Sequence, residues 1–195
     1  PLLAELAKMV DGLDVASAGE LDAALSSGIT ADRISFAGPG KRDDELARAL
    51  GAGIVINLES EGEAIRALAI AERQGRRPRL AVRVNPDFAL RGSGMRMGGG
   101  ARPFGVDAER VAPLVRRLID AGADWRGLHV FAGSQSLHAA AVIEAQAQTI
   151  ALGASIAAEV GVMPPTLNLG GGFGIPYFAG EEPLDVEAVG QALAT

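Results

Sequence analysis

The chain has 195 residues, of which 48% are hydrophobic, 22% charged and 4% aromatic, and its formal net charge is −6. This length suits one domain, or a large part of one, with enough residues to bury a core. The apolar content excludes a disordered chain, and the acidic balance, with a pI near 5.0, argues against a nucleic-acid partner.

Cysteine is absent, which excludes a disulfide framework, a thiolate metal site and a cysteine nucleophile, and which fits a reducing compartment. No uninterrupted apolar run approaches the roughly 20 residues of a membrane span, and the first residues do not resemble a signal peptide. The two histidines, His129 and His138, are too far apart to predict a metal site. We therefore expect a cytoplasmic protein without a metal ion, a membrane partner or a nucleic-acid partner.

Short apolar runs alternate with longer amphipathic segments along the chain, which is typical of βαβ units in a parallel sheet. Because such strands are buried on both faces, they form continuous apolar runs. In the helix over 61–73, Ile65, Leu68 and Ala69 are expected on the buried face. In chain order we expect a helix over 2–10, a strand over 13–16, a helix over 19–26, a strand over 34–37, a helix over 43–50, a strand over 54–58, a helix over 61–73, a strand over 80–84, a helix over 108–121, a strand over 128–131, a helix over 139–160, a strand over 167–169 and a helix from 186 onward.

Two α/β architectures fit this alternation, an open doubly wound sheet and a (β/α)8 barrel. An open sheet usually places its glycine-rich phosphate loop after the first strand, whereas the glycine-rich loop over 170–174 follows the last of the predicted strands. A phosphate site late in the strand order is typical of a barrel. The sequence therefore favours a partial (β/α)8 TIM barrel, and we expect its first strand before Pro1 and its closing strands after Thr195.

Two loops at the ends of predicted strands are candidates for a phosphate site. In the loop from Gly170 to Gly174, three successive glycines let backbone N–H groups approach a phosphate closely, although a mobile surface loop has the same composition. Ser134 follows the strand over 128–131, where its hydroxyl either donates to a phosphate oxygen or caps the following helix.

Four ionisable side chains interrupt buried strands or lie close to one. Asp14 and Arg83 lie within predicted strands, where a charge costs free energy unless it is paired or serves a site. They are expected to face each other or a ligand, with Glu20 close to them. His129 shares a strand face with Phe131, and it is either a satisfied interior residue or a general acid or base.

Two further charged segments lie outside the strands. The stretch from Arg91 to Gly100 is too long and irregular for an ordinary strand-to-helix connection, so it is either a functional loop whose arginines meet an anionic substrate or a disordered one. The run from Lys41 to Asp44 predicts a solvated helix start.

Motifs along the whole chain occur in the order and spacing of one known family. On these motifs the chain resembles the fold-III pyridoxal-phosphate decarboxylases, which include diaminopimelate, ornithine and biosynthetic arginine decarboxylases and share an alanine racemase-like barrel. It is most similar to the bacterial diaminopimelate type, with the exosortase-associated branch as one option. The motifs are Asp14-Val15-Ala16-Ser17-Ala18-Gly19-Glu20-Leu21, Val82-Arg83-Val84-Asn85-Pro86, Phe104-Gly105, Gly127-Leu128-His129, Gly133-Ser134-Gln135 and Leu169-Gly170-Gly171-Gly172-Phe173-Gly174.

The resemblance implies that pyridoxal 5'-phosphate binds at the carboxyl ends of the strands. It also implies that residues 1–195 are a fragment comprising the barrel domain, that a C-terminal β-domain lies outside them, and that the full-length protein is a homodimer. The implied cofactor-binding residues are Gly170, Gly171, Gly172 and Ser134 at the phosphate, Phe131 against the ring, Arg83 near the phenolic oxygen, and Asp14, Glu20 and His129 around the pocket.

The implied activity is decarboxylation of an amino acid, most similar to that of enzymes acting on meso-diaminopimelate or a related diamino acid. An amino-acid racemase on the same barrel and a non-catalytic cofactor-binding protein are the alternatives. The chain departs from the family in three ways: Phe131 replaces a stacking histidine, Pro103 replaces a lysine, and the lysine that forms the Schiff base is expected a few residues before Pro1. We therefore expect residues 1–195 to be catalytically inactive.

Overall fold

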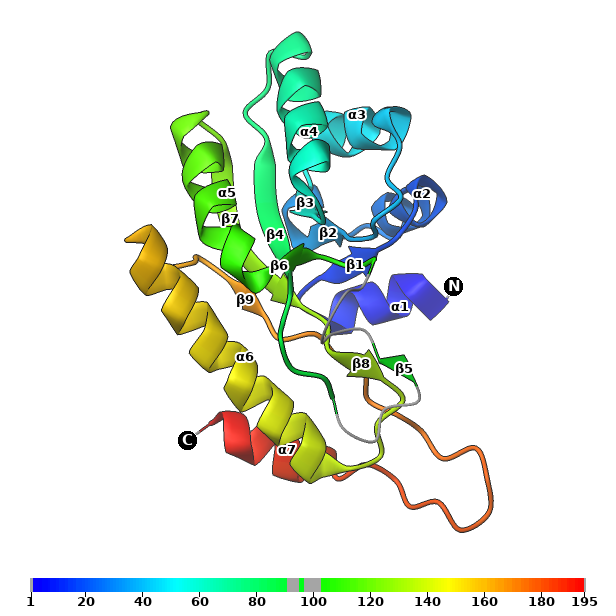
Figure 1. Ribbon diagram of the computed structural model, residues 1–195. Coiled ribbons are helices and arrows are strands. Elements are labelled where there is room, and N and C mark those ends of the chain that lie inside the picture. Colours follow the sequence, from blue (N-terminus) through cyan, green and yellow to red (C-terminus); the bar gives the residue numbers. More distant parts are fainter. Residues whose placement is uncertain (1, 91–94, 97–102, 195) are drawn as a thin grey trace.

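The computed structural model describes residues 2–90, 95–96 and 103–194, and most of the long loop from Arg91 to Gly100 lies outside these residues. Helices cover one side of a curved parallel sheet (Figure 1). The helices are α1 (Leu2–Met9), α2 (Ala18–Ser26), the 3-10 helix η1 (Ala31–Arg33), α3 (Asp43–Ala52), α4 (Glu61–Arg73), α5 (Ala108–Asp120), α6 (Ala139–Val160) and α7 (Val186–Leu193).

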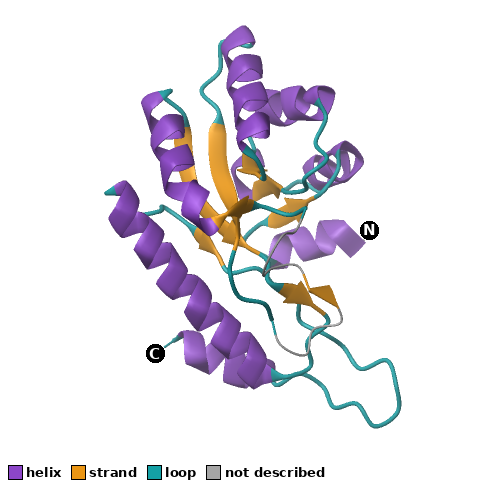
Figure 2. Cartoon of the chain, in the orientation of Figure 1, coloured by secondary structure: helices purple, strands orange, loops and turns teal. Residues whose placement is uncertain are grey.

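Among the described residues, six parallel strands form the main path of the sheet, in the order β1 (Leu13–Val15), β2 (Ile34–Phe36), β3 (Val55–Leu58), β4 (Arg79–Asn85), β7 (Asp124–Val130) and β9 (Leu167–Asn168). Each strand of this path pairs with the one that follows it along the chain, so the order never reverses as it does in a doubly wound sheet. The strand path and its covering helices (Figure 2) confirm the prediction of a partial barrel.

Three shorter strands complete the sheets at the edge where the main strands end. β6 (Val106–Asp107) pairs with the end of β4 beside the main path. β5 (Met95–Arg96) and β8 (Gly133–Ser134) form a separate antiparallel pair. This pair carries Ser134, one of the predicted site residues, away from the main sheet and toward the loop that follows β9.

The strands separate an apolar outer face from a polar inner face. Leu80, Val82 and Val84 of β4 are buried in the core beneath the helices. Because side chains alternate along a strand, Arg83 points to the opposite, inner face. Arg83 pairs in register with His129 of β7, and His129 pairs with Asn168 of β9, so these three polar side chains share the inner face.

Two helices differ in detail from the sequence prediction. α3 continues through Gly51 to Ala52 and is capped by Gly53, whose φ of 75° is a left-handed conformation that favours glycine. In α4 the bounds are as predicted, but Ile65 is 60% exposed, whereas Ala64 and Ala67 are buried. The apolar residues of α4 allow two overlapping buried faces. The face that is buried in the fold is the alanine-rich one, which includes Ala64, Ala67 and Ala71.

By length and composition alone, α6 could cross a membrane, with a mean hydropathy of 1.2 over 18 residues. The core helix of a soluble protein has the same properties, so this is weak support for a membrane span. In the fold, α6 packs against α5 and α7 and buries Val142, Ala145 and Ile156.

Candidate active site

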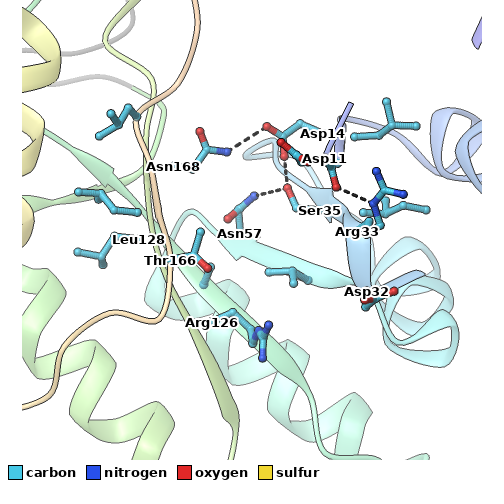
Figure 3. A pocket seen from close by; sticks show the side chains of 17 residues that line it. Asp11, Asp14, Asp32, Arg33, Ser35, Asn57, Arg126, Leu128, Thr166 and Asn168 are labelled. Carbon is cyan, nitrogen blue, oxygen red and sulfur yellow. Dashed lines mark hydrogen bonds between the residues drawn. The ribbon is translucent and has the colours of Figure 1, made fainter. Parts of the chain in front are cut away.

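Polar side chains from four strands meet on the inner face of the sheet, around a hollow of about 630 Å³ (Figure 3). Asn168 Nδ2 donates to Asp14 Oδ2 at 3.1 Å, and Asn57 Nδ2 donates to Ser35 Oγ at 3.0 Å. The Ser35 hydroxyl in turn donates to the other oxygen of Asp14. The partners of Asp14 are therefore neutral side chains, and the direct pairing with Arg83 that the sequence left open does not occur.

Arg83 is held by a carboxylate and two aromatic rings. Its Nη1 donates to Glu59 Oε1 at 3.0 Å, and both side chains are almost fully buried. The guanidinium carbon lies 5.0 Å from the centre of the Phe104 ring and 5.9 Å from that of the Phe131 ring. These distances allow cation–π attraction, so Phe104, Phe131 and Glu59 together fix the arginine head group. A cleft of about 520 Å³ beside it is lined in part by Arg83 and Phe104.

Lys41 is buried, and the prediction of a solvated start for this helix is wrong at that residue, which is 4% exposed. Its ammonium group donates to Gly38 O at 2.7 Å, Asn57 O at 2.8 Å and Glu63 Oε1 at 3.0 Å. Three donors thus have three acceptors, which offsets the cost of burying the charge. Burial lowers the pKa of Lys41, and the charge of Glu63 opposes that shift.

His129 is buried on the inner face, and its Nδ1 has no hydrogen-bond partner among the described residues. Burial lowers its pKa to about 4, although the nearby charge of Asp14 acts in the opposite direction. The imidazole is therefore neutral at neutral pH, with one ring nitrogen available to a ligand. This favours a binding role over that of an acid carrying a positive charge.

The glycine loop after β9 is anchored to the strand end that carries Ser134. Ser136 N donates to Gly172 O at 2.9 Å, and Gly174 N donates to Ser136 O at 2.8 Å. An added Cβ would lie 2.4 Å from Val130 O at Gly170 and 2.0 Å from Gly133 O at Gly172. These contacts argue against the alternative of a mobile surface loop, because both glycines are required by close backbone packing.

Gly171 differs from its two neighbours, because an added Cβ there would meet no described atom within 4 Å. Its outer side is therefore open to a ligand. Ser134 lies next to this loop in β8, and the residue that caps α6 is His138, so the alternative of Ser134 as the helix cap is wrong. The structure thus brings Ser134 and the glycine loop together.

Glu20 has a local structural role. Its Oε2 accepts from Ala16 N at 2.6 Å, while Glu20 N donates to Ser17 Oγ at 3.2 Å. Ser17 therefore caps the start of α2, and the Glu20 carboxylate binds the backbone of the residue before the cap. Glu20 therefore shapes the turn that follows Asp14, and no hydrogen bond or ion pair described for it reaches Arg83.

Comparison with known proteins gives the family directly. Residues 2–195 match the family described as pyridoxal-dependent decarboxylase, pyridoxal binding domain. The chain belongs to this family.

Relatives of this pyridoxal binding domain have several substrates. The chain is 40% identical over 179 residues to the L-glutamyl-[BtrI acyl-carrier protein] decarboxylase of Niallia circulans, covering 90% of this chain and 41% of the relative. It is 38% identical over 181 residues to the diaminopimelate decarboxylase of Methanothermobacter thermautotrophicus, with the same coverage of 90% and 41%. The chain spans less than half the length of these curated relatives.

The crystal structure of a mutant diaminopimelate decarboxylase from Helicobacter pylori, complexed with L-lysine, has the same fold. It superposes with a TM-score of 0.87 at 29% identity, over 98% of this chain and 49% of that chain.

The residues of this pyridoxal binding domain fit a phosphorylated, ring-shaped cofactor. Gly171 leaves open space beside backbone N–H groups, Ser134 adds a hydroxyl, and Nδ1 of the buried His129 has no partner in the part of the chain that the structure describes. Among the described residues, no group of three or more His, Asp or Glu side chains could hold a metal ion.

Sequence reasoning missed four residues of this region, namely Lys41, Glu59, Glu63 and Asn168. Glu59 and Glu63 lie on either side of Ser60, whose hydroxyl accepts from Glu63 N at 3.1 Å, so the segment has the pattern of an ordinary helix cap. Asn168 could have been found from the sequence, because it lies at a strand end only two residues before Gly170.

Proposed function

We propose that the full-length protein decarboxylates an amino acid with pyridoxal phosphate bound at the carboxyl ends of the barrel strands. One observation carries this proposal: Ser134, the glycine loop, Arg83 and Phe131 gather at one edge of the sheet in a chain of this family. When bound, the cofactor supplies the electron sink for the bond that breaks at the substrate's α-carbon.

The chain's own groups have separate tasks in this proposal. The backbone N–H groups of Gly171 and Gly172 and the hydroxyl of Ser134 donate to the phosphate, while Gly170, whose N–H is held by Asn168 Oδ1 at 2.9 Å, shapes the start of the loop. The side chain of Phe131 presents a ring face for stacking.

Around them, Arg83 places a fixed positive charge near the phenolic oxygen. His129 offers one neutral ring nitrogen, and Asp14 and Glu20 shape the wall formed by the end of β1. Because Phe131 carries no exchangeable proton, the proton that replaces CO₂ at the α-carbon comes from another group.

Neither lysine of the chain is placed to hold the cofactor covalently. Lys41 is committed to three buried partners, and Lys8 lies exposed on α1, paired with Glu5 at 2.8 Å. The proposal therefore requires a lysine from outside residues 1–195. Borohydride reduction of the full-length protein with pyridoxal phosphate, followed by peptide mass mapping, should label such a lysine; labelling of Lys8 or Lys41 alone, or of no lysine, would contradict the proposal.

For the substrate, we propose meso-diaminopimelate or a related diamino acid. Several curated relatives are diaminopimelate decarboxylases, among them those of Methanothermobacter thermautotrophicus and Vibrio cholerae. The relative at 40% identity is instead described as a decarboxylase of a glutamyl group on an acyl-carrier protein, so a carrier-bound amino acid is the second candidate.

The test is CO₂ release by the full-length protein with each candidate substrate. Release from free meso-diaminopimelate, and not from carrier-bound glutamate, is the expected result. Inversion at the α-carbon without CO₂ release would identify a racemase, and cofactor binding without either reaction would identify a non-catalytic protein. Residues 1–195 alone should release no CO₂.

We also propose that the full-length protein is a cytoplasmic homodimer without a nucleic-acid or membrane partner. Four large apolar side chains in and just after the glycine loop are 50–76% exposed, which supports burial against another part of the protein or a second copy. They are Phe173, Ile175, Tyr177 and Phe178. Light scattering after size-exclusion chromatography should give the mass of a dimer, and a monomer mass at micromolar concentration would contradict this part of the proposal.

A further inference from the structure

The carboxylate of Glu59 joins three separate segments at the edge of the candidate site. Its Oε1 accepts from Arg83 Nη1 at 3.0 Å and from the backbone N–H of Gly38, and its Oε2 accepts from Gly105 N at 3.1 Å. The side chain of Glu59 is 1% exposed. Because the carboxylate is buried and acts only as an acceptor, these donors are what make its ionised form tolerable there.

A second buried ion pair, between Lys41 and Glu63, holds the backbone of Glu59 in place. Glu59 N donates to Glu63 Oε2 at 2.7 Å, and Glu63 Oε1 accepts from Lys41 at 3.0 Å. The side chains of this second pair are 1% and 3% exposed, so neither is positioned to touch a ligand from solvent. The cluster of Lys41, Glu59, Glu63 and Arg83 therefore carries two charges of each sign, and only Arg83 among them faces both aromatic rings.

This arrangement fixes Arg83 before any ligand arrives. An arginine side chain has several rotatable bonds, and ordering it costs rotamer entropy. Here Phe104 and Phe131 lie against the guanidinium and Glu59 binds its edge. Glu59 also ties together Gly38 and Gly105, and Gly38 and Phe104 both line the cleft of about 520 Å³ beside Arg83.

We propose that Glu59 is a positioning residue that acts through Arg83 and the Phe104–Gly105 segment. It sets how tightly the pyridoxal cofactor is held and in which ionisation state. This inference rests on the proposed function, because it assumes that Arg83 lies near the phenolic oxygen of the cofactor. Glu59 itself does not touch the cofactor.

The test substitutes Glu59→Gln in the full-length protein and measures the dissociation constant of pyridoxal phosphate and the pH dependence of the bound cofactor's absorption. We expect the dissociation constant to rise about tenfold or more, because Arg83 is no longer held by a charged partner. We expect the midpoint of the pH-dependent absorption change to move to lower pH. Without Glu59 the positive charge of Arg83 is no longer compensated, and it therefore favours the deprotonated form of the cofactor.

The matched control is Glu61→Gln, which removes the ion pair between Glu61 and Arg110 at 2.7 Å on the outside of α4. It should leave both values unchanged. Glu59→Asp is the second variant, because it keeps the charge while drawing the carboxylate back by one methylene group. It should raise the dissociation constant less than the tenfold expected for Glu59→Gln, and this rise can be measured even if Glu59→Gln does not fold.

The outcomes separate the two proposals. If the unsubstituted protein does not bind pyridoxal phosphate, the proposed function and this inference both fail. If the unsubstituted protein binds it and the Glu59 variants bind equally well, with an unchanged pH midpoint, only the role of Glu59 is overturned. A lower melting temperature with unchanged cofactor binding would show that Glu59 is purely structural, and would also overturn the inference.

Discussion

Asp14 and Asn168 are 154 positions apart in the chain and are joined by a hydrogen bond of 3.1 Å on the inner face of the sheet (Figure 3). They lie on β1 and β9, the two outer strands of the main path. The six strands are therefore already curved enough to bring their first and last members within side-chain reach. Asn168 Oδ1 also accepts from Gly170 N at 2.9 Å, so a single amide links the carboxylate to the glycine loop.

The first prediction concerns this link. Asn168→Asp places a second carboxylate within hydrogen-bonding distance of Asp14, and we expect it to lower the free energy of unfolding of the full-length protein by about 1 kcal/mol at neutral pH. Because one of the two carboxylates takes up a proton on acidification, the loss should shrink toward pH values of about 5. Urea unfolding at the two pH values measures the effect.

The control for this prediction is Asn168→Ala, which removes the same hydrogen bond without adding charge. Its loss of stability should be similar at both pH values. A pH-independent loss in Asn168→Asp would show that repulsion from Asp14 is not the cause.

Sequence reasoning gave the fold because each buried strand is an apolar run bounded by turn residues. It also singled out the glycine loop, Ser134 and Arg83 as candidates, because glycine triplets and charges within strands are visible in the sequence alone. Lys41 was misjudged because its acceptors are a carbonyl oxygen of its own loop, a carbonyl oxygen of β3 and a carboxylate of α4. Such a group of partners exists only after the strands have aligned their carboxyl ends.

The second prediction separates the structural glycines from the one open to a ligand. Gly172→Ala should lower the free energy of unfolding by about 2 kcal/mol or more, because its φ of 80° is left-handed and its Cβ would lie 2.0 Å from Gly133 O. Gly171→Ala should leave stability within about 0.5 kcal/mol, yet raise the dissociation constant of pyridoxal phosphate about tenfold. Thermal denaturation and cofactor titration measure the two effects, and unchanged cofactor binding in Gly171→Ala would refute the assignment of the phosphate to this loop.

The third prediction compares two lysine–glutamate pairs of opposite burial. Lys41→Met leaves Glu63 as a buried carboxylate without its charged partner, and should lower the free energy of unfolding by about 3–5 kcal/mol. Lys8→Met breaks an exposed ion pair with Glu5, and the two side chains are 67% and 69% exposed. This substitution should change the free energy of unfolding by less than about 0.5 kcal/mol. Equal losses in urea unfolding of the two variants would contradict the buried placement of Lys41.

The last prediction concerns acid stability and follows from the burial of His129. Burial lowers its pKa to about 4 in the folded protein, from the ordinary value of 6.5. Between these values the unfolded chain binds a proton that the folded protein does not, so stability falls as the pH falls through this window. The loss is at most about 3 kcal/mol, and it vanishes above the ordinary pKa, where the imidazole is neutral in both states. His129→Gln should therefore lose less stability than the unsubstituted protein between about pH 7 and pH 4.5, whatever its stability at pH 7.

Carboxylates that titrate in the same range affect both proteins and cancel in the comparison. The exposed His138 provides the control, and His138→Gln should keep the full acid dependence in urea unfolding. If His129→Gln keeps it as well, the acid sensitivity arises from other groups, and His129 is not held neutral by burial on the inner face of the sheet.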